Sequence, residues 1–114
     1  MARRTEVKTL QLCKQVERTL SMVLSGELED EVLDGLAVIS VNAIDGSSLL
    51  LVEVALPTDT RGLTADEVHE HLHRAAGLFR REVAAAVRRK RVPQLAFKVI
   101  TADQGEAETT LERD

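Results

Sequence analysis

The residues best suited to chemistry are cations gathered in one stretch of the chain. Between residues 74 and 98, eight Lys and Arg side chains stand against the single acid Glu82, a net charge of +7. Most are Arg, whose planar fork binds phosphate bidentately. Such a local surplus predicts an anion-binding surface. The cations are Arg74, Arg80, Arg81, Arg88, Arg89, Lys90, Arg91 and Lys98.

Helical spacing places several of these cations on one face together with small residues. At about 100° per residue, an arc of about 140° collects Arg74, Gly77, Arg80, Arg81, Ala84, Ala85 and Arg88. The small residues would let a phosphodiester backbone approach. A mid-helix glycine costs about 1 kcal/mol, so Gly77 predicts a helix break or a close approach, and a break would expose backbone N–H groups to an anion. The alternatives are plain solvent exposure of the arginines and tight packing at Gly77.

Three histidines form the one cluster with a metal-like pattern. His69 and His73 share a helix face at i, i+4, near Asp66 and Glu70, whereas His71 points elsewhere. Two His and a carboxylate can hold Zn²⁺, but a third fixed ligand and a general base are missing from the pattern. We interpret the cluster as a polar exposed turn and expect neither a metal site nor a cofactor.

Composition excludes several other classes of protein. Cys13 is the only cysteine, so an internal disulfide or a cysteine cage is excluded, and we expect a small buried side chain in a reducing cytosol. Aromatic residues make up 2% of the chain, too few for a base-stacking platform. The sequence contains no nucleophile elbow, phosphate loop or dinucleotide fingerprint. It also has no signal-peptide pattern and no apolar run of about 18 residues. We therefore expect a soluble, intracellular protein that does not bind membranes.

The overall net charge of −4 conceals a polarised chain. Residues 1–26 sum to +3, 27–70 to −10, 74–98 to +7 and 102–114 to −4. The total length of 114 residues is that of one domain. We expect residues 1–101 to fold and residues 102–114 to form an acidic, disordered tail. The acidic segments would keep the surface opposite the cations away from RNA.

Hydrophobic spacing and turn residues predict the elements. A helix should run from residue 4 to about 25, ending at Gly26, and an acidic connector should follow it. Strands are expected at 36–44 and 49–56 around a turn at 45–48, and at 94–100 after Pro93. A capping box of Thr64 and Glu67 predicts a long helix before Pro93. The apolar positions of the first helix are Val7, Leu10, Cys13, Val16, Leu20, Val23 and Leu24; those of the second are Val68, Leu72, Ala75, Ala76, Phe79, Val83, Ala86 and Val87.

This order of elements, α-β-β-α-β, predicts a fold of the α+β class. A helix between two strands of one sheet crosses over right-handedly. Both helices would then cover one face of a three-stranded mixed sheet.

Several segments resemble the ribosome-binding factor A family. They are the triplet Ala75-Ala76-Gly77 at the helix interruption, the following residues 78–83, and the pattern Arg91-x-Pro93-x-Leu95-x-Phe97. The first helix and the hairpin are also similar, so the resemblance covers about residues 3–100. It implies a single type II KH-like domain, in which a kink formed by Ala75 and Gly77 replaces the usual Gly-x-x-Gly loop.

The resemblance also implies a function. Members of the family are small cytoplasmic ribosome assembly factors, not enzymes, that bind the immature 30S subunit and assist maturation of 16S rRNA near its 5′ end. The expected partners are therefore 16S rRNA and free 30S subunits, bound by a monomer. The candidate RNA contacts are Arg74, Arg80, Arg81, Arg88, Arg89, Lys90 and Arg91. The alternative is a protein-interaction module of similar fold, whose arginines dock an acidic partner surface.

Overall fold

A three-stranded mixed sheet forms the centre of the fold. The computed structural model describes residues 3–45, 48–56, 62–87 and 91–100. The strands are β1 (Ala37–Asp45), β2 (Leu49–Ala55) and β3 (Gln94–Ile100). Strand β2 pairs antiparallel with β1 and parallel with β3. The predicted hairpin and the predicted mixed sheet are confirmed.

The two faces of the sheet differ in polarity. Successive side chains of a strand point to opposite faces, and in β2 the residues Leu50, Val52 and Val54 are fully buried. The opposite face carries Glu53, which accepts a hydrogen bond from Ser40 Oγ (3.1 Å) and pairs with Lys98 Nζ (3.7 Å). The helices therefore pack on the apolar face, as predicted.

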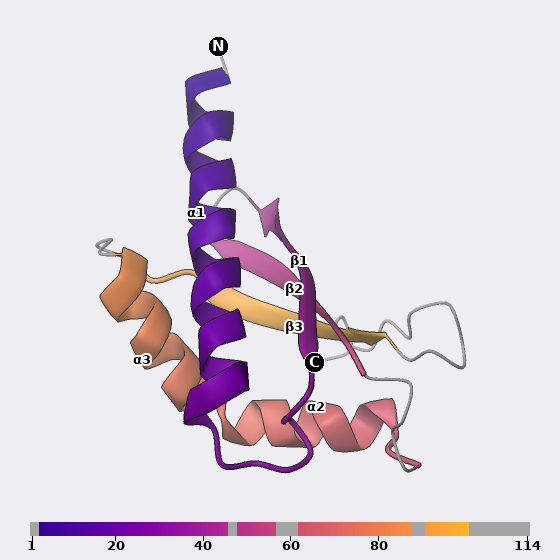
Figure 1. Cartoon of the computed structure of the whole chain (residues 1–114). Coiled ribbons are helices and arrows are strands. Elements are labelled where there is room, and N and C mark those ends of the chain that lie inside the picture. Colours follow the sequence, from indigo (N-terminus) through magenta and orange to yellow (C-terminus); the bar gives the residue numbers. More distant parts are fainter. Residues whose placement is uncertain (1–2, 46–47, 57–61, 88–90, 101–114) are drawn as a thin grey trace.

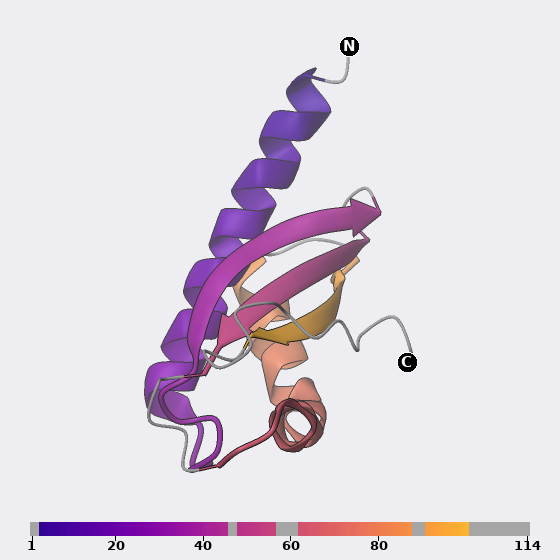
Figure 2. The same cartoon turned by 90° about the vertical axis from the view of Figure 1, so that its right-hand side faces the viewer.

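Helix α1 (Arg3–Met22) crosses that apolar face and ends in a π-helical turn, η1 (Val23–Glu27) (Figures 1 and 2). Its buried side includes Val16 and Leu20, both fully buried. The first turns extend past the sheet (Figure 1). No described element covers this end, and Val7 and Leu10 are 48% and 60% exposed, contrary to the expectation that both belong to the apolar face.

The predicted second helix is divided into α2 (Ala65–Arg74) and α3 (Ala76–Val87). Helix α2 starts as predicted: Thr64 Oγ1 accepts from the Glu67 N–H (3.1 Å), and Glu67 Oε1 accepts from the Thr64 N–H (3.0 Å). Figure 1 shows α3 beside α1, and α2 lying across the lower end of the fold at an angle to both, with its last turn next to the start of α3. No helix in the described parts is long and apolar enough to span a membrane.

Cys13 belongs to the core, as predicted. It is 4% exposed and forms no disulfide. Burial raises the pKa of its thiol, although a hydrogen bond with the Ala43 backbone opposes this. A buried thiol held in its neutral form is chemically inert.

The acidic connector between η1 and β1 is packed against α2. Asp30 Oδ1 accepts hydrogen bonds from the Val32 and Leu33 N–H groups (2.9 and 3.2 Å), and Leu33 is fully buried. His71 Nδ1 of α2 lies 2.8 Å from Asp30 Oδ2, and both side chains are about three-quarters buried. One carboxylate thus both shapes the connector and attaches it to α2.

We expect Asp30→Ala to lower the free energy of unfolding by about 1–3 kcal/mol, because buried N–H groups lose their acceptor. Burial raises the pKa of Asp30, but hydrogen bonds from His71, Leu33 and Val32 outweigh it and hold that pKa below its ordinary value of 3.8. The stabilisation is therefore complete above pH 3.8 and is lost as the pH falls through the lower folded-state pKa. Urea denaturation of both proteins as a function of pH measures this; a pH-independent difference would contradict it.

Candidate nucleic-acid interface

The helix interruption lies at Ala75, the first residue of the predicted kink. Its backbone has φ −88° and ψ 2°, outside the helical range of ψ, while its N–H still donates to the His71 and Leu72 carbonyls (both 3.1 Å). The Phe79 N–H then donates to the Ala75 carbonyl (3.1 Å). The three amides between them, those of residues 76–78, form the first turn of α3, where a helix leaves its N–H groups without intrahelical partners. The predicted break is therefore present.

Gly77 is the second residue of α3, and the fold does not require it to be glycine. Its φ is not among the positive values, which occur at Gly35 and Gly62 within the described residues. A Cβ built on Gly77 meets no atom within 4 Å, so the tight-packing alternative is wrong for the described part of the chain. Gly77 is exposed. An approaching molecule would meet bare backbone at the N-terminal end of α3.

Arg80 and Arg81 lie in the first half of α3. Both are exposed, and neither forms an ion pair with any described residue. Their charges are therefore available to an external anion, and they add to the positive end of the helix dipole.

Arg74 is placed differently from the other two. It ends α2, and its guanidinium lies 3.2 Å from Glu70 Oε2 one turn earlier, with both side chains 64% exposed. The prediction that Arg74 and Arg80 share one face assumed a continuous helix, and this assumption does not hold across the break. For the same reason Ala76, expected on the buried face, is exposed.

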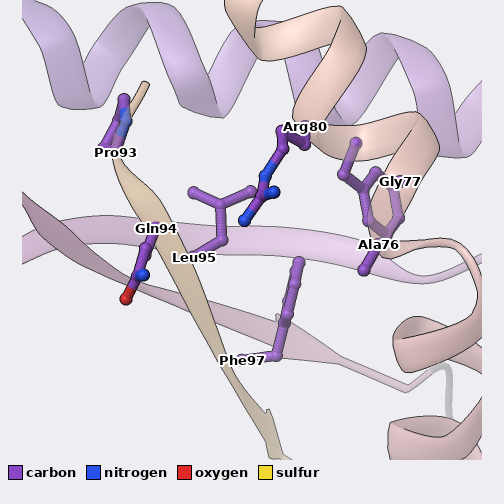
Figure 3. Close-up of a pocket in the computed structure, with 8 residues that line it drawn as sticks. Ala76, Gly77, Arg80, Pro93, Gln94, Leu95 and Phe97 are labelled. Carbon is purple, nitrogen blue, oxygen red and sulfur yellow. The ribbon is translucent and has the colours of Figure 1, made fainter. Parts of the chain in front are cut away.

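A surface pocket of about 230 Å³ lies between the start of α3 and β3 (Figure 3). Arg80 reaches from α3 toward Leu95 and Phe97, and Gly77 stands on the same side of the pocket. The far wall begins at Pro93 and Gln94. A guanidinium, bare helix backbone and an apolar floor thus meet in one place.

The remaining predicted RNA contacts precede β3. Arg91 is described and exposed. Arg88, Arg89 and Lys90 lie outside the described residues, as does the predicted tail of residues 102–114. These assignments stay predictions.

The histidine cluster forms no metal centre in the described parts of the chain, where no group of three His, Cys, Asp or Glu side chains is placed to hold an ion. His71 instead contacts Asp30. Its neighbours His69 and His73 line a larger groove beside β3, which shares Ala76, Gln94, Leu95 and Phe97 with the pocket between α3 and β3.

Sequence reasoning missed the pocket between α3 and β3. The alternation of Leu95 and Phe97 does indicate that both face the helices. Which helix residues they meet depends on the direction of α3 after the break, and that direction is a property of the tertiary packing.

The elements and the break together define a type II KH-like domain: a parallel pair, β2 and β3, is joined through two helices that meet at a sharp interruption. The comparisons with family models and with curated proteins found no match. Among solved structures, ribosome-binding factor A from Thermus thermophilus is 27% identical, with a TM-score of 0.68 over 80% of this chain and 93% of that chain.

A second similar structure is a homology model of Thermus thermophilus ribosome-binding factor A, fitted into the cryo-electron microscopy map of its complex with the 30S subunit. It is 28% identical, with a TM-score of 0.58 over 74% of this chain and 86% of that chain. The chain is therefore similar in both sequence and fold to ribosome-binding factor A over most of its length.

We expect Gly77→Ala to raise the free energy of unfolding by about 0.5–1 kcal/mol, because alanine restricts the unfolded chain and its Cβ enters open space. Thermal unfolding of the two proteins measures the change. A lower melting temperature for the variant would show that the break needs glycine for the fold itself.

Proposed function

We propose that this protein is a ribosome assembly factor that binds the immature 30S subunit. The exposed face of α3, around Gly77, Arg80 and Arg81, contacts 16S rRNA, and the bound protein assists maturation of the rRNA near its 5′ end. It acts by binding as a cytoplasmic monomer and catalyses no reaction. Arg74, Arg88, Arg89, Lys90 and Arg91 are proposed as further contacts.

The observation that carries the proposal is the combination of unpaired arginines with bare backbone at one helix start. Arg80 and Arg81 have no ion pair with described residues, and Gly77 has open space where a side chain would stand. The similarity to ribosome-binding factor A also supports it, since one similar structure was fitted into a map of a 30S complex.

The proposed mechanism is recognition of phosphate and shape. Arginines neutralise phosphates and release condensed counterions, so binding weakens as salt rises. A phosphate at the start of α3 would accept hydrogen bonds from the free N–H groups of the first turn. Base stacking contributes little, because both aromatic residues, Phe79 and Phe97, are at least partly buried against each other.

We predict that Arg80→Glu/Arg81→Glu weakens binding to free 30S subunits by at least about tenfold. The slope of the logarithm of the binding constant against the logarithm of salt concentration should become shallower by about 2, roughly one for each lost phosphate contact. Co-sedimentation with immature 30S subunits over a series of salt concentrations measures both effects.

The matched control is Lys8→Glu/Lys14→Glu, which changes the net charge equally at exposed positions of α1. It should retain most of the affinity. Equal loss in the two variants would assign the effect to overall charge, and unchanged binding of the α3 variant would refute this RNA face.

Gly77→Leu provides a second test of the same face. We expect it to fold normally, because no atom lies within 4 Å of the Cβ position, and to bind 30S subunits several-fold more weakly because its side chain keeps the rRNA backbone away from the helix start. Filter binding, with circular dichroism as the check on folding, distinguishes the two effects. Undiminished affinity in a folded variant would argue against close backbone approach.

A further inference from the structure

A second and larger hollow, the β3-edge groove, lies between α2 and β3 and extends to Ile44 of β1 and Leu49 of β2. Its volume is about 1050 Å³. Helix α2 contributes polar residues to one wall, and the rest is largely apolar. The residues that line it are Ile44, Leu49, Asp66, His69, Glu70, Leu72, His73, Ala76, Gln94, Leu95, Ala96 and Phe97.

The edge of β3 that faces away from β2 has backbone groups that pair with no described strand. Gln94 N–H donates to Ser48 (2.9 Å) and the Ile100 carbonyl accepts from Leu56 (3.1 Å), so even-numbered residues of β3 bond toward β2. In a parallel pair alternate residues direct both groups to the same side, so odd-numbered residues point outward. No described strand pairs with that side. Val99 is fully buried, whereas Leu95 and Phe97 are partly exposed, so their amides are the ones that a partner strand could reach.

The charge of the groove differs from that of the α3 face. No Lys or Arg is among its described lining residues, whereas Asp66 and Glu70 both line it. Glu70 also pairs with Arg74, but both side chains are 64% exposed, and exposed pairs of this kind exchange partners at little cost. Polyanionic RNA would be repelled here, while a cation would be attracted.

We propose that the β3-edge groove binds an extended, cationic segment of a protein partner. The segment adds a strand beside Leu95 and Phe97, places alternate apolar side chains in the groove, and sets Lys or Arg against Asp66 and Glu70. This goes beyond the proposed RNA contact and does not rest on it.

The probe is a seven-residue peptide that alternates Val and Lys and has acetylated and amidated ends. In an NMR titration of the full chain we expect shifts confined to β3 and α2, with slower hydrogen exchange at the Leu95 and Phe97 amides. Asp66→Lys/Glu70→Lys should bind it about tenfold more weakly. The matched control, Glu29→Lys/Asp34→Lys, makes the same charge change on the exposed connector and should bind normally.

Two further arms test the mode of binding. A peptide N-methylated at alternate residues keeps its charge but loses strand pairing, and it should not bind. Arg80→Glu/Arg81→Glu should bind the peptide normally while losing 30S affinity, so failure of the RNA proposal and failure of this one are distinguishable.

Three results would overturn the proposal. Equal weakening in the connector control would mean unspecific charge attraction. Binding of the methylated peptide would exclude strand addition. Shifts of the Leu95 and Phe97 amides by oligouridylate, with tighter binding to Asp66→Lys/Glu70→Lys, would assign the groove to RNA.

Discussion

The contact between Phe79 and Phe97 determines how the functional surface is presented. The two ring centroids lie 5.5 Å apart, and Phe79 is almost completely buried. This contact anchors α3 to β3 shortly after the interruption at Ala75. Because Phe79 points inward, Gly77 and Arg80 must lie at the surface beside β3. A continuous helix could not bury Val68 and Leu72 of α2 and also aim α3 in this direction.

Local patterns in the sequence predicted most of the elements, whereas features set by distant residues had to be seen in the structure. Strand β3 spans the predicted residues, and the capping box at Thr64 forms, because both depend on near neighbours. The exposure of Val7 and Leu10 depends on where the sheet ends. The pair of Asp30 and His71 joins residues 41 positions apart, beyond the range of any local pattern.

The candidate site was predicted in part for the same reason. Arg80 and Arg81 lie on an exposed helix face, as their spacing indicates. Because the helix is interrupted at Ala75, Arg74 belongs to a different helix and does not share that face. The segregation of charge follows from this geometry. Helix α3 carries arginines free of described partners, and α2 carries Asp66, Glu67 and Glu70 against Arg74. Adjacent surfaces on either side of the break therefore suit ligands of opposite charge.

The most direct measurement of the central claim is site-specific photocrosslinking to immature 30S subunits. A photoreactive residue in place of Ala85, exposed on α3, should crosslink to 16S rRNA, whereas one in place of Ile39, 50% exposed on β1, should give far less rRNA product. Equal rRNA yields from the two positions, or crosslinks from Ala85 to ribosomal proteins alone, would contradict an RNA interface on α3.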